Sequence, residues 1–290
     1  MITPDAATTI DLVDPIDLAR TTLPLRLGPN DPSSAVVDGS VWLAVRTPLG
    51  GATVRIGYVG RTVEVVAWGE GADAAVDSSP NLIGATDDTS AFRTGTAEVE
   101  DLARRFAGVR LPRSGAVADA LIAHLVWRTH TPFEAQRARL QLAERWGGRA
   151  PGPTTLLLPP DPQELAGATH YDLHLAGLNP PVADMVKRIA ASARRLDALA
   201  LLPPGDAHRR LREVAGVDEW VAAKVAIAAL GAPDAVPLGD VDLNRLVTSV
   251  ISGSPTDSDD AFQACLAPWK GQRARVIRLI ESAQVPSPSG

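Results

Sequence analysis

The sequence contains little cysteine and few aromatic residues. One cysteine, Cys265, occurs among its 290 residues. A single thiol excludes a disulfide framework and a four-cysteine iron–sulfur cluster, and is typical of a reducing compartment. Aromatic residues make up 4% of the chain, and six of them are tryptophans. The few large rings are therefore the first residues to consider as pocket walls.

Long apolar runs and an excess of positive charge are also missing. No run reaches the roughly 18 apolar residues that a membrane span needs, and no basic-then-apolar segment opens the chain. We therefore expect a cytoplasmic protein, associated with the nucleoid if it binds DNA. The net charge of −6 counts against a general nucleic-acid coat protein. It remains compatible with a local basic face.

Cofactor and metal motifs are weak. Gly69-Glu70-Gly71 is not followed by the lysine and hydroxyl residue of a phosphate loop. His170 and His174 stand four residues apart but have no third ligand in reach. We predict that the protein needs neither a cofactor nor a metal.

The first third of the chain has the pattern of a sheet. Three β-type runs, 41–47, 52–58 and 62–68, are separated by short turns containing Gly and Pro, which predicts an antiparallel meander. Residues 1–20 are expected to form a frayed start, and a short helix is expected from residue 74. We assign this part a structural role and no chemistry.

From residue 111 the pattern becomes helical. Apolar residues at helical spacing predict helices over 116–128, 133–146, 163–167, 181–199 and 259–266, with a proline-rich loop over 149–162. The predicted class is α+β. An N-terminal β-rich domain (1–110) precedes an all-α module (111–282), and a disordered tail (283–290) follows.

The most informative stretch runs from 211 to 246. Gly216 permits a tight turn, Asp218 is a good N-cap for a helix over 220–230, and Gly231 with Pro233 ends that helix. Asp240 and Asp242 then precede a helix over 243–251, whose N-terminus favours an ionised carboxylate. Asp242 is expected to be the cap or a supporting group.

This layout resembles the helix-hairpin-helix DNA glycosylase superfamily, and within it the bacterial 3-methyladenine DNA glycosylase II branch. The resemblance spans most of 111–282 and, more loosely, the N-terminal sheet. It implies a helix-hairpin-helix glycosylase module after a sheet domain like the TATA-binding protein. The matching residues are Gly216-Val217, Trp220, Ala222-Ala223, Leu230-Gly231, Pro233-Asp234-Ala235 and Gly239-Asp240.

The resemblance also implies roles for individual residues. Asp240 would be catalytic, and the base pocket would include Trp220, Trp269, Lys224 and Val241, the last two at positions that are often aromatic in that branch. Contacts to DNA would come from the hairpin (Gly216, Val217, Asp218), from the turn that fills the gap left by the flipped base (Arg128, Thr129, His130), and from Lys270 and Arg273.

The implied reaction is hydrolysis. Strand-cleaving relatives use a lysine amine where this chain has Trp220, which implies a monofunctional enzyme. As a monomer it would flip a damaged base, most simply an alkylated purine, out of double-stranded DNA and leave an abasic site.

Three alternatives remain open. Asp240 can be a helix cap and nothing more. Asp218 and Glu219 stand where the family pattern has a glycine and then a neutral or basic residue, which favours a catalytically weak or inactive paralogue that binds damaged DNA or another partner. Arg137, Arg139, Arg275 and Arg278 can form a basic face together with Lys270 and Arg273, or simply solvated helix faces.

Overall fold

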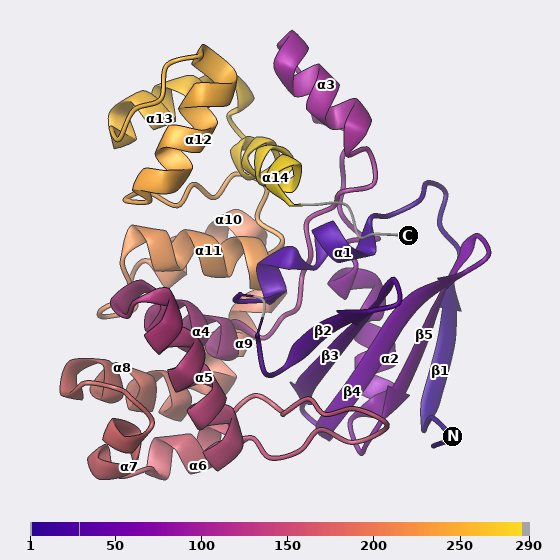
Figure 1. Ribbon diagram of the computed structural model, residues 1–290, viewed down its shortest axis with the longest axis vertical. Coiled ribbons are helices and arrows are strands. Elements are labelled where there is room, and N and C mark those ends of the chain that lie inside the picture. The colour runs from indigo at the N-terminus through magenta and orange to yellow at the C-terminus, as the bar shows by residue number, and fades with distance from the viewer. Residues whose placement is uncertain (1, 29, 286–290) are drawn as a thin grey trace.

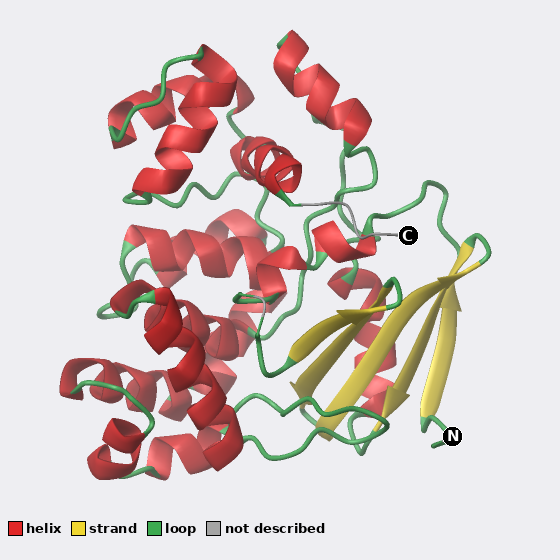
Figure 2. Cartoon of the chain, in the orientation of Figure 1, coloured by secondary structure: helices red, strands yellow, loops and turns green. Residues whose placement is uncertain are grey.

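The protein consists of a five-stranded sheet and a larger helical body that packs beside it (Figures 1 and 2). The coordinates are a computed structural model that describes residues 2–28 and 30–285. The chain begins at the outer edge of the sheet, η1 (Leu23–Leu25) and α3 (Ala97–Arg105) already pack against helices of the later chain, and the last helix, α14 (Arg273–Gln284), lies beside α3.

All five strands are antiparallel, in the order β1-β5-β4-β3-β2. The predicted runs are confirmed as β3 (Ser40–Thr47), β4 (Gly50–Val59) and β5 (Thr62–Trp68). The expectation of a frayed start was wrong, because β1 (Ala6–Ile10) pairs with β5, and α1 (Leu18–Thr21) and the 3₁₀ turn η1 (Leu23–Leu25) follow. β2 (Ser34–Val37) was not predicted either. Both are short edge strands, and their pairing depends on a partner more than on their own sequence.

Each face of the sheet is covered. Val41, Leu43 and their neighbours on one face pack under α2 (Ala72–Leu82). Because side chains alternate along a strand, Trp42 and Trp68 lie on the other face, stacked with ring centroids 5.6 Å apart. The proline-rich loop predicted over 149–162 covers that face, with Leu156 and Leu158 packed against Ala44 and Trp42.

The helical body carries most of the remaining chain. The helices expected over 116–128, 133–146 and 259–266 are confirmed as α4 (Val117–Thr129), α5 (Pro132–Trp146) and α13 (Asp259–Leu266). The others are α6 (Pro162–Gly167), α7 (His170–Leu175), α8 (Pro180–Ala191), α9 (Ala193–Asp197), η2 (Ala198–Leu201), α10 (Pro204–Leu211), α11 (Glu219–Leu230), α12 (Val241–Ser252), η3 (Ala267–Trp269) and α14 (Arg273–Gln284). The helix α3 (Ala97–Arg105) was not predicted.

The helix α11 lies at the centre of this body. Ten of its twelve residues are buried, as expected for a helix that is apolar on every side. It packs against α4, α10 and η1. A second helical cluster forms where α3 meets α12 and α14 (Figure 1). The two clusters meet at the loop that connects α11 with α12, and Asp240 lies at the end of that loop.

The predicted division at residue 110 stays a prediction. The helix α3 precedes that boundary in sequence but packs with the C-terminal helices. At the other end, α14 continues to Gln284, so residues 283 and 284 of the predicted tail are helical. Residues 286–290 of that tail lie outside the described residues.

Candidate active site around Asp240

Asp240 is held by two hydrogen bonds, one to each carboxylate oxygen. Its Oδ1 accepts the backbone N–H of Leu243 at 3.0 Å, which makes Asp240 the N-cap of α12. Its Oδ2 accepts the indole Nε1–H of Trp220 at 2.9 Å. The cap is therefore Asp240 itself, one of the alternatives left open, and Asp242, expected to be the cap or a supporting group, is not the cap and is exposed in the first turn. The two hydrogen bonds fix the orientation of the carboxylate.

The backbone before Asp240 is fixed as well. Gly239 adopts a positive φ of 80°, and an added Cβ there would lie 3.1 Å from the guanidinium of Arg128. Arg128 donates to the Gly239 carbonyl at 3.1 Å, and the Gly239 N–H donates to Asp259 at 3.0 Å. The positive φ favours glycine here. The loop therefore presents the Asp240 carboxylate in a single position.

A cavity of about 310 Å³ opens beside Asp240. Its walls come from η1 and the residues after it, from α4, from α11 and from α14. The lining residues are Leu23, Pro24, Arg26, Leu27, Gly28, His124, Trp127, Trp220, Lys224, Ile227, Asp240, Arg278 and Glu281. Residues of the segment 23–28, which precedes the three predicted strands, form one wall of this cavity.

Charged side chains at this cavity are joined in a network. Lys224 and Arg278 both pair with Glu281, with N–O distances of 3.3 and 2.6 Å. Burial by itself raises the pKa of Glu281, but Lys224 and Arg278 outweigh it and bring the pKa down to about 2. Burial also lowers the pKa of His124 to about 3, and Lys224 and Arg139 act in the same direction. At neutral pH, Glu281 is therefore ionised and His124 is uncharged.

Trp220 connects the cavity to the hairpin. Its ring lies edge to face with His124, with centroids 5.9 Å apart. The Arg128 guanidinium carbon lies 5.4 Å and the Lys224 ammonium 5.7 Å from the ring centroid. Trp220, Lys224 and Asp240, which were predicted as site residues from the sequence, therefore come together at one cavity.

The hairpin carries its own acidic groups and their partners. Gly216 has a φ of 88°, and Val217 closes the turn through its N–H to Val214. Asp218 caps α11 by accepting the Val221 N–H at 2.8 Å, and it pairs with Arg128 at 3.0 Å. Glu219 pairs with Arg212 at 2.6 Å. One helix N-terminal N–H that could bind a phosphate is thus already bonded within the protein.

Two predicted pocket residues lie elsewhere. Trp269 is 4% exposed and its indole donates to the Thr94 carbonyl at 2.8 Å, inside the cluster of α3, α12 and α14. Val241, in the first turn of α12, is 44% exposed. Neither is among the described residues that line the Asp240 cavity. The family resemblance assigned both residues to the pocket, but the Trp269 side chain is buried in another cluster and Val241 is exposed.

The turn after α4 is less open than expected. Thr129 donates to the Leu125 carbonyl at 2.8 Å, and the ring nitrogens of His130 lie 3.0 and 3.2 Å from the carbonyls of Val126 and Gly177. Phe133, at the start of α5, is 75% exposed. This ring was not among the residues predicted from the sequence, although apolar residues in such turns are candidates to enter a DNA stack.

The predicted basic face on α14 and the turn before it is largely neutralised. Lys270 is exposed, but Arg273 forms a bidentate pair with Asp234. Arg275 and Arg278 are buried against Asp87 and Glu281. The expectation that these two arginines belong to a solvated or DNA-facing surface was wrong. Asp87 is 188 positions from Arg275, so the run of basic residues gave no sign of that pair, whereas Glu281 lies three positions after Arg278 on the same helix.

Other sequence candidates have ordinary roles. His170 begins the short helix α7 and pairs with Asp184 at 2.7 Å. Within residues 2–28 and 30–285, no cluster of three or more His, Cys, Asp or Glu side chains could hold a metal ion. None of the helices in this described part combines the length and the apolar character that crossing a membrane requires.

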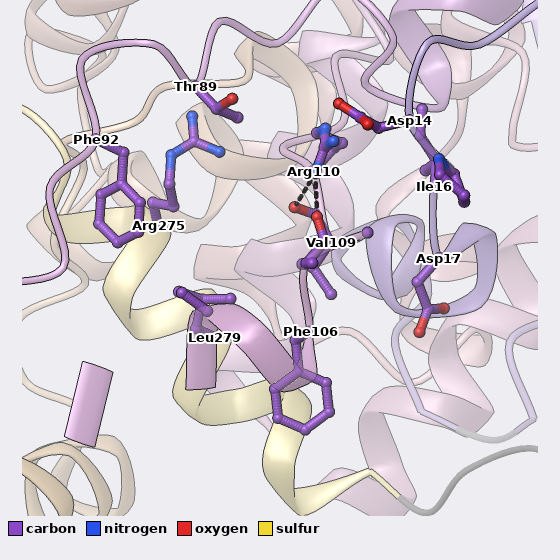
Figure 3. Close-up of a pocket in the computed structure, with 14 residues that line it drawn as sticks. Asp14, Ile16, Asp17, Thr89, Phe92, Phe106, Val109, Arg110, Arg275 and Leu279 are labelled. Carbon is purple, nitrogen blue, oxygen red and sulfur yellow. Dashed lines mark hydrogen bonds between the residues drawn. The ribbon is translucent and has the colours of Figure 1, made fainter. Parts of the chain in front are cut away.

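A larger cavity, of about 750 Å³, lies between α14 and the segments 14–17 and 103–110 (Figure 3). Several of its polar groups are already bonded within the protein. Arg110 donates to the carbonyls of Ala107 and Val109, Arg275 pairs with Asp87 beside the Phe92 ring, and Asp17 pairs with Arg20. It shares no lining residue with the Asp240 cavity. We therefore place the candidate active site at the smaller cavity.

Comparison with known proteins at the level of sequence gives no match. No protein-family model matches the chain, and no curated protein sequence does. The fold, in contrast, matches solved structures over nearly its whole length.

Three of these matches cover nearly the whole of this chain and nearly the whole of the matched structure. The 3-methyladenine DNA glycosylase from Archaeoglobus fulgidus has a TM-score of 0.78 and 19% identity, covering 96% of this chain and 98% of that one. The 8-oxoguanine glycosylase/lyase from Clostridium acetobutylicum, in its apo form, has a TM-score of 0.72 and 11% identity, covering 97% and 98%. MBOgg1, solved with a low-affinity DNA ligand, has a TM-score of 0.74 and 13% identity, covering 96% and 95%. From the first strand to the last helix, this chain has the fold of the helix-hairpin-helix DNA glycosylases.

Proposed function

We propose that this protein is a monofunctional DNA glycosylase of the 3-methyladenine DNA glycosylase II type. It would flip a damaged base, in the first instance an alkylated purine, from double-stranded DNA and hydrolyse its N-glycosidic bond. The observation that carries the proposal is the Asp240 carboxylate, oriented by Leu243 and Trp220 at the edge of a cavity. The protein would act as a monomer, without a cofactor, on nucleoid DNA in the cytoplasm.

The chemistry follows from the position of this carboxylate. When the bond between C1′ and the base breaks, positive charge develops on the sugar. A fixed anion stabilises that charge best when it needs no reorganisation, and the two hydrogen bonds supply this preorganisation. Each oxygen of Asp240 accepts one described hydrogen bond, which leaves lone pairs to face the sugar and to orient the attacking water.

The size and walls of the cavity suit a flipped base. Its volume of about 310 Å³ is at the lower end of the roughly 300–1,000 Å³ of small-molecule pockets. Trp127 and Trp220 offer aromatic surface, and Leu23, Leu27 and Ile227 offer apolar surface. Stacking on rings and exclusion of water are what a base needs once it has left the duplex.

The proposed absence of strand cleavage has its own support. Strand-cleaving glycosylases attack the sugar with an amine, and the lysine at this cavity is Lys224. Its ammonium group is held by Glu281 at 3.3 Å and lies over the Trp220 ring. Since that cation already has two partners within the protein, we propose that it does not act as a nucleophile.

The proposal is tested with duplex oligonucleotides that each carry one defined lesion. We expect release of the free base with the strand left intact, and strand scission only after alkali. Borohydride should trap no protein–DNA adduct. If the protein released no base from any duplex of the panel, while a related active enzyme assayed in parallel did, the proposal would be refuted. Trapping by borohydride would refute only the monofunctional part.

A second candidate function has one specific observation in its favour. The acidic hairpin residues are bonded within the protein, with Asp218 capping α11 and pairing with Arg128. A protein that grips DNA weakly through its hairpin could serve as a damage-binding paralogue with little catalysis. Removing the charge of Asp218 tests whether this carboxylate weakens the binding of duplex DNA.

Asp218→Asn is expected to bind duplex DNA more tightly by about threefold to tenfold at low salt. Asparagine keeps the cap, removes one negative charge near the phosphates, and releases Arg128 to contact them. The measurement is fluorescence anisotropy with an abasic-analogue duplex at about 50 mM and about 200 mM salt, where phosphate contacts weaken. Asp77→Asn, an exposed carboxylate on α2, is the matched control. Equal affinity of the two variants would show that the hairpin does not approach phosphates.

A further inference from the structure

We infer that the Asp240 cavity selects an electrically neutral base and excludes purines that carry a fixed positive charge, with Lys224 as the residue that sets this selection. The inference rests on the proposed function and narrows its substrate class. Among alkylated purines it favours those whose ring system stays neutral.

The charges around the cavity favour an uncharged ligand. Of the described residues that line it, Arg26, Lys224 and Arg278 are cations and Asp240 and Glu281 are carboxylates. Glu281 is paired with both Lys224 and Arg278, whereas Asp240 accepts from two neutral donors and keeps its charge, which faces the sugar in the proposed reaction. His124 adds no charge at neutral pH, because burial lowers its pKa. A cationic base would therefore enter a lining with one excess positive charge.

The aromatic surface leads to the same conclusion. An aromatic ring attracts a cation through the negative charge over its face, at up to about 6 Å from the centroid. Both Lys224 and Arg128 already lie within that distance of the Trp220 ring. A cationic purine that stacked on Trp220 would have to displace one of them or lie close to both. A neutral base that stacks there meets no such repulsion.

The same cation assists departure of a neutral base. When the bond between C1′ and the base nitrogen breaks, its electron pair goes to the base, which becomes anionic. Water then bonds through oxygen to C1′, and one of its protons ends on the base. An ammonium group in the pocket stabilises the transient anion. A base that already carries a positive charge leaves as a neutral molecule and needs no such stabilisation. Lys224 therefore favours neutral substrates in bond cleavage as well as in binding.

The test compares two kinds of lesion in otherwise identical duplexes. The first duplex carries the cationic base 7-methylguanine. The second duplex carries a neutral base, 1,N6-ethenoadenine or hypoxanthine, at the same position. Single-turnover rates of base release give the ratio of neutral to cationic cleavage. We expect the wild-type protein to favour the neutral base, and Lys224→Met to lower this ratio by about tenfold. Lys224→Arg, which keeps the charge, should retain most of the ratio.

The controls separate selection from folding. Lys187→Met removes a lysine of α8, bonded to the Ala168 carbonyl and away from the cavity, and should leave the ratio unchanged. Since both lesions are cleaved by the same preparation, a partly unfolded variant lowers both rates and not their ratio.

Two results overturn the inference. In the first, the wild-type protein releases 7-methylguanine faster than the neutral base. In the second, Lys224→Met has the same ratio of neutral to cationic release rates as the wild-type protein. In either case base release is still observed, so the proposed glycosylase function stands. If no base is released from any duplex, the proposed function fails and the inference fails with it.

Discussion

Asp240→Asn is expected to lower the rate of base release by at least about a hundredfold. The substitution removes the anion that faces the developing charge on the sugar, and preorganised charges of this kind contribute factors of about 10² to 10³. The measurement is single-turnover release from the best substrate of the lesion panel.

The same variant is expected to lose a little stability. Aspartate accepts from Leu243 and Trp220 on different oxygens, whereas asparagine has one acceptor oxygen and must give up one of the two bonds. The expected cost is about 1–2 kcal/mol. The assay is therefore run well below the melting temperature of the variant.

Two controls show which property of Asp240 matters. Asp242→Asn removes an exposed carboxylate two residues further along α12 and should change the rate less than about twofold. Trp220→Phe removes the same indole hydrogen bond but keeps the carboxylate, so it should retain more activity than Asp240→Asn. If Asp240→Asn released base as fast as wild type, Asp240 would be a helix cap only.

Asp87→Ala is expected to destabilise the fold by about 3–5 kcal/mol. Asp87 and Arg275 form a bidentate pair, with both distances 2.7 Å and with side chains only 8% and 6% exposed. Asp87 also accepts the Leu111 N–H at 3.0 Å. Removing the carboxylate leaves a guanidinium buried without its counter-ion, which is the costly way to break such a pair. Thermal unfolding should show a midpoint lower by about 10 °C.

A matched pair on the surface provides the control. Asp101 pairs with Arg104 and Arg105 on α3, where all three side chains are well exposed. Asp101→Ala should lower the unfolding midpoint far less than Asp87→Ala does, because exposed ion pairs contribute little to stability. The double variant Asp87→Leu with Arg275→Met, which removes both charges, should recover much of the loss. If Asp87→Ala cost no more than Asp101→Ala, the buried pair would contribute nothing specific to the fold.

The elements predicted from the sequence are those that local patterns define. The helices α4, α5 and α11 follow from apolar spacing within a few turns, and β3, β4 and β5 from alternation bounded by glycine turns. β1 and β2 were missed because four or five residues at a sheet edge carry little pattern of their own. α3 was missed although it has a good cap in Thr96, because its apolar face is short.

In the candidate site, too, the features that depend on local sequence were predicted, and those that depend on distant contacts were not. The order of hairpin, helix, loop and Asp240 was readable because each signal is a cap or a turn within a few residues of its effect. Trp220 and Lys224 were predicted at the pocket and do line it. Trp269 was assigned to the same pocket by resemblance, but its indole is bonded to Thr94, 175 positions away. The wall formed by Leu23 to Gly28 had no sequence signal.

The sequence by itself determined the α+β class and the carboxylate at the start of α12, because caps, periodicity and turns act over short distances. Only the tertiary structure decided which charges remain available. Arg275 and Asp87 are 188 positions apart, and Lys224 and Glu281 are 57 apart. Arg278 and Glu281 are three positions apart on α14, so that pair is local. Charges attract through space, so the pairs of Arg275 with Asp87 and of Lys224 with Glu281 form only when the fold brings their partners together.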